Sequence, residues 1–401
     1  MANSLTPITS VNTLQMFIDR SQEFDVRPEL YYTQQVLDMI QIPSEEYVYF
    51  RLATETPIPN KGQKLQLRRW SPLQAHTVPL VEGIPPEFDK SSVEVYTIPA
   101  YQYGRAMEFT DVVDFTTIDP VVSMYMTEYG IVAVETLDLL AREAMAAVSQ
   151  PYFANQKPNF EGLTIADAPS ITDLRLVILD FKKNLVDPRM GNKYTVIGSP
   201  DFYFDLVMDP LVQAFIGIEN NSMEVFTRGQ IPDMFNMSFQ ETRACPISGE
   251  FYDGSGVLSL RVVSLNPDGT ANAYATIPST NATVFSRVSG YVNDSRTGDP
   301  TSFIPDRAVW DLSAYTAPPA GPWKALAVNH IYVVGKDALV RTGLSGEGNV
   351  KTYAKGPGSA GTLDPIDQRQ SIGFKINSVG FGSSRVEAIV DYMCCPSQSN
   401  V

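Results

Sequence analysis

Residues 119–150 read DPVVSMYMTEYGIVAVETLDLLAREAMAAVSQ, and this stretch predicts a single long helix. Asp119 is suited to the N-cap and Pro120 to the first helical position, while Pro151 ends the pattern. Apolar residues follow one helical stripe: Val122, Tyr125, Met126, Tyr129, Val132, Ala133, Leu137, Leu140, Ala144 and Val148. The opposite, polar face is expected to carry Glu128, Glu135, Asp138, Arg142 and Glu143. At 1.5 Å per residue, a helix over 120–149 is a rod of roughly 45 Å, long enough to be the structural spine of a domain.

The 401-residue chain has the composition of a folded protein, with 44% hydrophobic residues, 19% charged residues and a net charge of -15. A chain this acidic repels polyphosphate, and its basic runs are only the pairs Arg68–Arg69 and Lys182–Lys183. Sequence-specific binding of nucleic acid is therefore disfavoured. The N-terminus has no basic stretch followed by an apolar one, and no apolar run approaches 18 residues. We expect a protein that is neither exported by a signal peptide nor inserted in a membrane.

The segments before the long helix read as extensions from a globular body. Residues 1–55 are short polar segments with one modest helical pattern around 30–40, typical of an arm. Residues 56–100 predict a long two-stranded hairpin, which is marginal alone and so is expected to lie against another subunit or lobe. The residues expected at such a subunit interface are Gln63, Leu65, Leu67, Arg68, Arg69, Trp70, Glu82 and Glu94.

After the long helix the pattern changes to that of an α/β lobe. Ser170 is suited to cap one helix, and a strand at 194–197 leads into Ser199–Pro200, a cap and first-turn proline for a second helix. Residues 248–325 are rich in Gly, Ser, Thr, Asn and Pro around short strand patterns, which predicts a β-rich insertion. Strands at 371–379 and 386–393 are expected to close the chain.

The chain offers little that indicates catalysis. Its two histidines, His76 and His330, belong to different predicted lobes, so a Ser-His-Asp or Cys-His relay would need a coincidence of the fold. The three cysteines include the adjacent pair Cys394–Cys395, whose direct disulfide would be strained, and they provide no zinc-ligand spacing. The glycines of 356–361 lack the flanking strand and helix of a dinucleotide site. We therefore predict no catalytic residues, no metal and no cofactor.

The order of arm, hairpin, spine helix and α/β lobe is accompanied by short motifs that together carry a resemblance. They are Trp70–Pro72, Leu80–Gly83, Gln102–Gly104, Thr110–Asp111, Asp119–Pro120, Gly335–Ala338, Gly358–Gly361, Asp364–Pro365, Gln368–Arg369 and Gly373–Lys375. In this order the chain resembles the major capsid proteins of tailed bacteriophages, in the podovirus-type branch that includes the N-four-like phages. Two departures are the long insertion and Phe374, where the branch leads one to expect Trp.

The resemblance implies an α+β, HK-97-like phage capsid fold. Its parts would be an N-arm over 1–55, an E-loop hairpin over 56–100, and a P-domain over 101–169 with the spine helix. An A-domain over 170–365 would carry the insertion, and 366–401 would supply closing P-domain strands and the C-terminus.

The same resemblance implies a protein of the virion. It would form the hexamers and pentamers of an icosahedral shell around double-stranded DNA, assembled in the host cytoplasm. Scaffolding and portal proteins, and in some phages a decoration protein, are the implied partners. Two other functions stay open from the residues alone: another virion component, from the tail or the decoration of the shell, and a soluble carboxylate-dependent hydrolase.

Overall fold

The computed structural model describes residues 47–58, 64–71, 90–110, 121–189, 191–218, 233–281, 323–343, 350–356, 368–383 and 385–400, with shorter pieces between them. Residues 1–46 of the arm predicted over 1–55, including the helical pattern around 30–40, lie outside these residues. Residues 47–50 and described parts of 54–141 and 340–382 form one compact unit. The second unit contains described parts of 142–339 and 383–400 together with residues 51–53.

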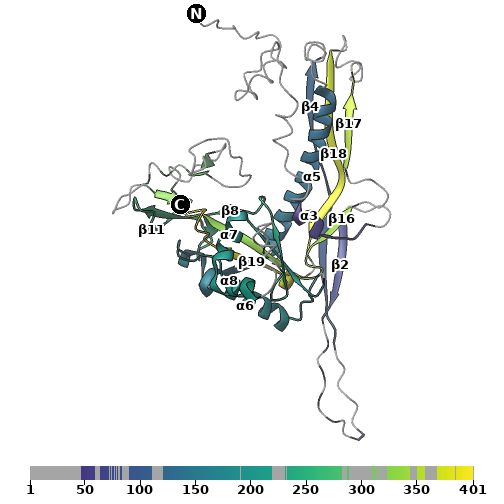
Figure 1. Cartoon of the computed structure of the whole chain (residues 1–401). Helices are drawn as coiled ribbons and strands as arrows, with labels where there is room; N and C mark the ends of the chain where they lie inside the picture. The colour runs from purple at the N-terminus through teal and green to yellow at the C-terminus, as the bar shows by residue number, and fades with distance from the viewer. Residues whose placement is uncertain are drawn as a thin grey trace, which may run out of the picture. The chain divides into compact units, whose positions relative to one another are not determined.

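Strand β18 (Arg369–Gly382) is the centre of the sheet in the first unit (Figure 1). One of its edges pairs with β4 (Tyr101–Thr110), and the other pairs with β17 (Val350–Lys355) and β16 (Val340–Gly343), all antiparallel. The short β1 (Thr54–Glu55) extends the sheet in parallel with β16. Alternate apolar residues of β18 point to one face, as the two-residue period of a strand requires.

The predicted long helix is confirmed as α5 (Val121–Val148). Its buried apolar positions recur every four residues, at Ala133, Leu137, Ala141 and Met145. In the first unit, Ala133 and Leu137 pack with three residues of β18. These residues are Phe374, Ile376 and Val379.

The predicted polar face of α5 is wrong for two residues, because Asp138 and Arg142 are buried. Asp138 accepts a hydrogen bond of 2.8 Å from the backbone N–H of Phe50, in the short helix α3 (Val48–Leu52). Arg142 donates through Nη1 to the carbonyl of Ala244 at 2.9 Å. The sequence pattern predicts both residues on the polar face, and backbone partners that the sequence does not reveal allow them to be buried.

The predicted hairpin is present as β2 (Lys64–Trp70) and β3 (Val93–Pro99), paired antiparallel in a two-stranded sheet. Only Ile98 of this pair is fully buried. A two-stranded sheet with so little covered surface is marginal in water.

A six-stranded sheet forms the body of the second unit. Its order is β5 (Gln150–Phe153), β19 (Ile389–Cys394), β15 (Val328–Val334), β6 (Tyr194–Gly198) and β7 (Met237–Glu241), with β8 (Ile247–Ser248) also paired to β15. Its helices are α6 (Ile171–Lys183), α7 (Pro200–Met208) and α8 (Pro210–Ile218), and short 3-10 turns occur at Ala154–Gln156, Phe160–Gly162 and Val386–Ala388. Both predicted caps are confirmed: the Ser170 hydroxyl accepts from Thr172 N–H and the Ser199 hydroxyl accepts from Phe202 N–H.

The predicted β-rich insertion contains its own small sheet. Its antiparallel strands are β9 (Glu250–Tyr252), β10 (Leu258–Leu265), β11 (Ala271–Pro278) and β14 (Trp323–Ala325), and β12 (Arg287–Val288) pairs separately with β13 (Val309–Trp310). Leu260, Val262, Ile277 and Leu312 form its core. Asn266–Gly269 makes the predicted turn between β10 and β11, and Gly269 has the positive φ of 83° that favours glycine.

The two units divide the chain differently from the expected domain limits. The closing segment 366–401 contributes to both, because β18 lies in the first unit and β19 in the second. Strands β16 and β17, expected within the lobe over 170–365, pair with β18 instead. Strand β19 is buried along nearly its whole length and lies between two neighbours, β5 and β15. Continuous burial is typical of a strand covered on both faces, which explains its place in the larger α/β unit.

Candidate functional site

The β2–β3 hairpin contains most of the residues predicted for a subunit interface, and its register sorts them onto two faces. Leu65 lies opposite Ile98, Leu67 opposite Tyr96, and Arg69 opposite Glu94, so these six side chains share one face. On β2, the members of this face are half-buried. Opposite charges directly across an antiparallel pair stabilise its register, and Arg69 and Glu94 have this arrangement.

The other face of the hairpin presents apolar side chains to solvent. Trp70 lies opposite Val93, and Arg68 opposite Val95. Trp70 is 67% exposed and Val95 is 53% exposed. We name Trp70, Val93 and Val95 the hairpin patch. An aromatic and two β-branched residues on one open strand pair form a surface suited to burial against a partner.

Two further predicted interface residues lie outside these strands. Glu82 is exposed, in a turn with Gly83, whose φ is 84°. Gln63 lies outside the described residues. The two segments of the hairpin remain hydrogen-bonded beyond Trp70, because Ser71 N–H donates to Ser92 O at 2.9 Å and the two serine hydroxyls lie 2.7 Å apart.

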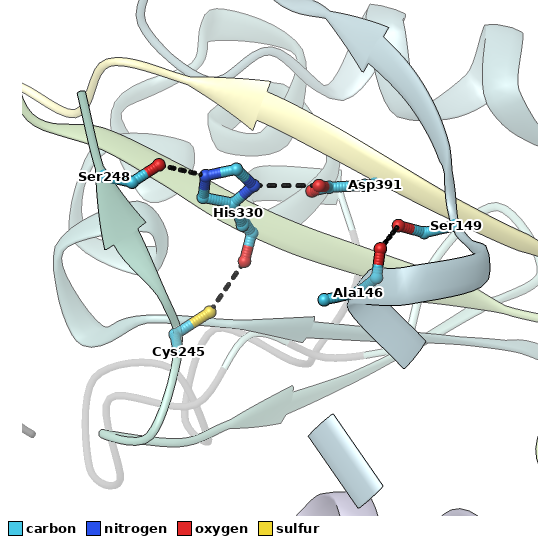
Figure 2. A network of polar contacts seen from close by, with 6 residues as sticks. All are labelled: Ala146, Ser149, Cys245, Ser248, His330 and Asp391. Carbon is cyan, nitrogen blue, oxygen red and sulfur yellow. Dashed lines mark hydrogen bonds and ion pairs between the residues drawn. The ribbon is translucent and has the colours of Figure 1, made fainter. Parts of the chain in front are cut away.

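The second unit contains a polar network that sequence reasoning missed. Figure 2 shows Ser248, His330 and Asp391 side by side across β8, β15 and β19. His330 Nε2 lies 2.7 Å from Ser248 Oγ, and His330 Nδ1 lies 2.8 Å from Asp391 Oδ2. Strand register explains the row: Ser248 pairs with Val328, two residues before His330, and Asp391 pairs with Tyr332, two residues after it. All three side chains therefore share one face of the sheet. No local motif joins residues that are 82 and 61 positions apart.

The electrostatics of this network favour a charged histidine. The side chains of His330 and Asp391 are 14% and 7% exposed. Burial by itself lowers the pKa of His330, but the charge of Asp391 and the hydrogen bond to it more than offset this effect and raise the pKa overall. An imidazolium donates from both ring nitrogens, to Asp391 and to Ser248.

The cysteines do not suggest a reactive site. All three are free and buried, which agrees with the expectation that Cys394 and Cys395 are not joined. Burial, with the nearby charge of Asp167, raises the pKa of Cys395 to about 12, and burial also raises the pKa of Cys394. A thiol that stays protonated is a poor nucleophile.

Within the described part of the chain, no three His, Cys, Asp or Glu side chains are placed to hold a metal ion. The helices of that part are all too short or too polar to span a bilayer.

Comparison with protein-family models gave no match. Comparison with curated protein sequences also gave none. Comparison with solved structures gave matches over most of the chain. The capsid asymmetric unit of cyanophage Pam1 is 9% identical, with 93% of this chain and 97% of that chain covered and a TM-score of 0.58. The capsid of Ralstonia phage GP4 is 10% identical, with 93% of each chain covered and a TM-score of 0.51.

A third match is the capsid structure of cyanophage P-SCSP1u, which is 13% identical, with 85% of this chain and 86% of that chain covered and a TM-score of 0.50. At such low identity these likenesses concern the fold, and they extend over both compact units rather than over one. The narrower resemblance to the N-four-like branch stays a prediction. The chain has the HK-97-type fold of tailed-phage capsid proteins.

Proposed function

We propose that this chain is a major capsid protein, which self-assembles into the icosahedral shell around the double-stranded DNA of a tailed bacteriophage. The observation that carries the proposal is a fold shared with phage capsid structures over more than nine-tenths of the chain in two of the three comparisons above. A tail or decoration component, the nearest alternative from the sequence, has no such support.

The hairpin supports assembly on physical grounds. Stable protein interfaces bury about 1,600 Å² in total, and an extended hairpin reaches a neighbour with few residues. The hairpin patch, formed by Trp70, Val93 and Val95, exposes apolar area to solvent in the monomer, and burial of this area against another subunit would be favourable. We assign the subunit interface to both hairpin faces, with Leu65, Leu67, Arg69 and Glu94 on the half-buried face.

The charge of the chain supports enclosure of DNA without tight binding. A lining rich in Lys and Arg would hold phosphates strongly, because phosphate contacts dominate affinity for DNA. A net charge of -15 disfavours that adhesion. Within this proposal, hexamers and pentamers form in the host cytoplasm, and separate scaffolding and portal proteins direct them.

The Ser248–His330–Asp391 network has a structural role in this proposal. It joins three neighbouring strands of the second unit through side chains, in addition to their backbone pairing. We propose no catalytic residues.

Expression in bacteria followed by electron microscopy tests the function. The chain should form closed shells of uniform diameter, alone or with a co-expressed scaffold. A variant lacking residues 63–94 should stay folded by circular dichroism and form no shells. Wild-type protein that remains monomeric with and without a scaffold would contradict the proposed capsid function. A deletion variant that forms shells would contradict the assignment of the hairpin to the subunit interface.

A further inference from the structure

A cavity of about 310 Å³ lies in the second unit, on one face of strands β6 and β7. Thr195 and Ser238 are cross-strand partners, and Gln240 lies two residues further along β7, so the three side chains share this face. Their hydroxyl and amide groups form a polar wall. Arg51 of α3 and Arg189 of the loop before β6 also line the cavity.

One of the three cations that line this cavity is paired with a carboxylate of the lining. Lys193 is paired with Asp233, with Nζ 2.6 Å from Oδ2, so these two charges cancel. Arg189 donates through Nη2 to the carbonyl of Arg51 at 3.2 Å. Among the described residues, neither the guanidinium of Arg51 nor the other donors of Arg189 has a hydrogen-bonded or ion-paired partner. Two positive charges therefore remain at the cavity.

Partial burial makes this imbalance significant at Arg189, whereas Arg51 is exposed. Desolvation lowers the pKa of Arg189, an effect that the charge of Asp337 opposes without an ion pair between them. A half-buried guanidinium costs free energy unless an anion or further acceptors reach it. The planar fork of Arg matches a carboxylate in a bidentate contact, and the neighbouring hydroxyls can donate to the same oxygens.

We infer that this cavity receives a carboxylate side chain from a neighbouring copy of this chain in the assembled shell. The inference rests on the proposed function, because it needs neighbouring copies. Charge complementarity selects the occupant: the chain has 45 acidic and 30 basic residues, so an adjoining copy presents mainly carboxylates. The same acidity disfavours a nucleic-acid phosphate as the occupant.

A reconstruction of wild-type shells at side-chain resolution tests the occupant directly. An Asp or Glu of a neighbouring subunit should lie about 3 Å from the Arg189 guanidinium, the distance of a charge-assisted hydrogen bond. A cavity filled by solvent, by a phosphate or by a residue of the same chain would overturn the inference.

Variants test its contribution to assembly. Arg51→Gln and Arg189→Gln should each lower the yield of shells about tenfold, the factor expected for loss of one charge-assisted contact. Lys182→Gln is the matched control, because it removes the same charge from an exposed position of α6. Added NaCl should weaken wild-type shells more than the small population of Arg189→Gln shells, since salt screens ionic contacts.

Circular dichroism of the monomers separates assembly from folding. The Arg51 guanidinium has no hydrogen bond or ion pair to the described residues, so Arg51→Gln should fold normally and keeps the test decisive if Arg189→Gln fails to fold. Normal yields from both variants would overturn this inference alone. Wild-type protein that forms no shells would overturn the proposed function as well, which distinguishes the two failures.

Discussion

The carboxylate of Asp138 accepts a hydrogen bond of 2.8 Å from the backbone N–H of Phe50, although helical spacing predicts Asp138 on a solvent face of α5. Phe50 is the third residue of α3, where backbone N–H groups have no partner within the helix. An anion at this position also meets the positive end of the helix dipole. Asp138 therefore links α5 to α3 by satisfying a donor that α3 cannot satisfy itself.

Removal of this acceptor should destabilise the first unit. We expect Asp138→Ala to lower the free energy of unfolding by about 1–3 kcal/mol, because it leaves a buried N–H unpaired. Asp138→Asn retains an acceptor oxygen and should lose less. Urea denaturation of the unassembled protein measures both changes. Glu143→Ala, at an exposed position of the same helix, is the control, and equal losses from Asp138→Ala and Glu143→Ala would refute the role given to Asp138.

The buried stripe of α5 gives a second prediction. Leu137 is 2% exposed and packs with Phe374 and Ile376 of β18. Leu137→Asp should cost several kcal/mol and prevent folding, because it buries a carboxylate without a partner. Glu143→Gln should change stability by at most about 0.5 kcal/mol. Circular dichroism beside shell yield measures both, and a well-folded Leu137→Asp protein would show that the register assigned to α5 is wrong.

Local signals explain what the sequence predicted well. The limits of α5 follow from proline punctuation and apolar spacing, and the Ser199–Pro200 start of α7 follows from cap chemistry. The turn at Asn266–Gly269 follows from turn residues in the same way. Each of these features depends on interactions within a few residues, which a single sequence displays.

Features that depend on distant pairing were not predictable in the same way. The sequence predicts Asp138 and Arg142 on a polar face because their backbone partners, Phe50 and Ala244, are far away in the chain. The row of Ser248, His330 and Asp391 follows from the order of three strands, and the sequence alone leaves that order open. The strands of the hairpin are predictable from the sequence because an alternating pattern between turn signals is itself local.

The third prediction concerns Gly380, which lies close to the backbone of Pro99. A Cβ at this position of β18 would lie 2.2 Å from the carbonyl oxygen of Pro99, so the backbones approach too closely for any side chain. Gly380→Ala should therefore destabilise the first unit by about 1–3 kcal/mol, as overpacking against rigid backbone does. Gly254→Ala, where a Cβ meets nothing within 4 Å, is the matched control. Thermal melting of the unassembled protein compares them, and equal melting temperatures would contradict the close approach.

Variants of the hairpin patch should affect assembly of the shell but not folding of the monomer. Trp70→Ser and Val95→Ser should leave the stability of the monomer within about 0.5 kcal/mol, because both side chains are exposed there. Each should lower shell yield at least tenfold if the side chain is buried between subunits, since aromatic anchors often contribute about 2 kcal/mol or more. Tyr252→Ser, at an exposed aromatic of the insertion, should assemble normally. Normal yields from the two hairpin variants would remove the patch from the interface.

The His330–Asp391 pair predicts how stability depends on pH. The pKa of His330 is raised in the folded protein above an unfolded value of about 6.5. The folded state therefore binds its proton more tightly, and the stabilisation is complete below about pH 6.5 and is lost as pH rises through the folded value. Between pH 6 and 8, below the range in which unfolded thiols of about pKa 8.5 titrate, the melting temperature of the second unit should fall.

Two variants isolate this titration. His330→Gln removes the titrating group and should flatten the decline in melting temperature, although it lowers stability throughout because Asp391 loses its charged partner. His76→Gln, the only other histidine substitution the chain allows, should keep the wild-type slope. Melting curves of unassembled protein at half-unit pH intervals measure these slopes. A His330→Gln protein with the wild-type slope would mean that the imidazole of His330 does not hold its proton as the buried ion pair requires.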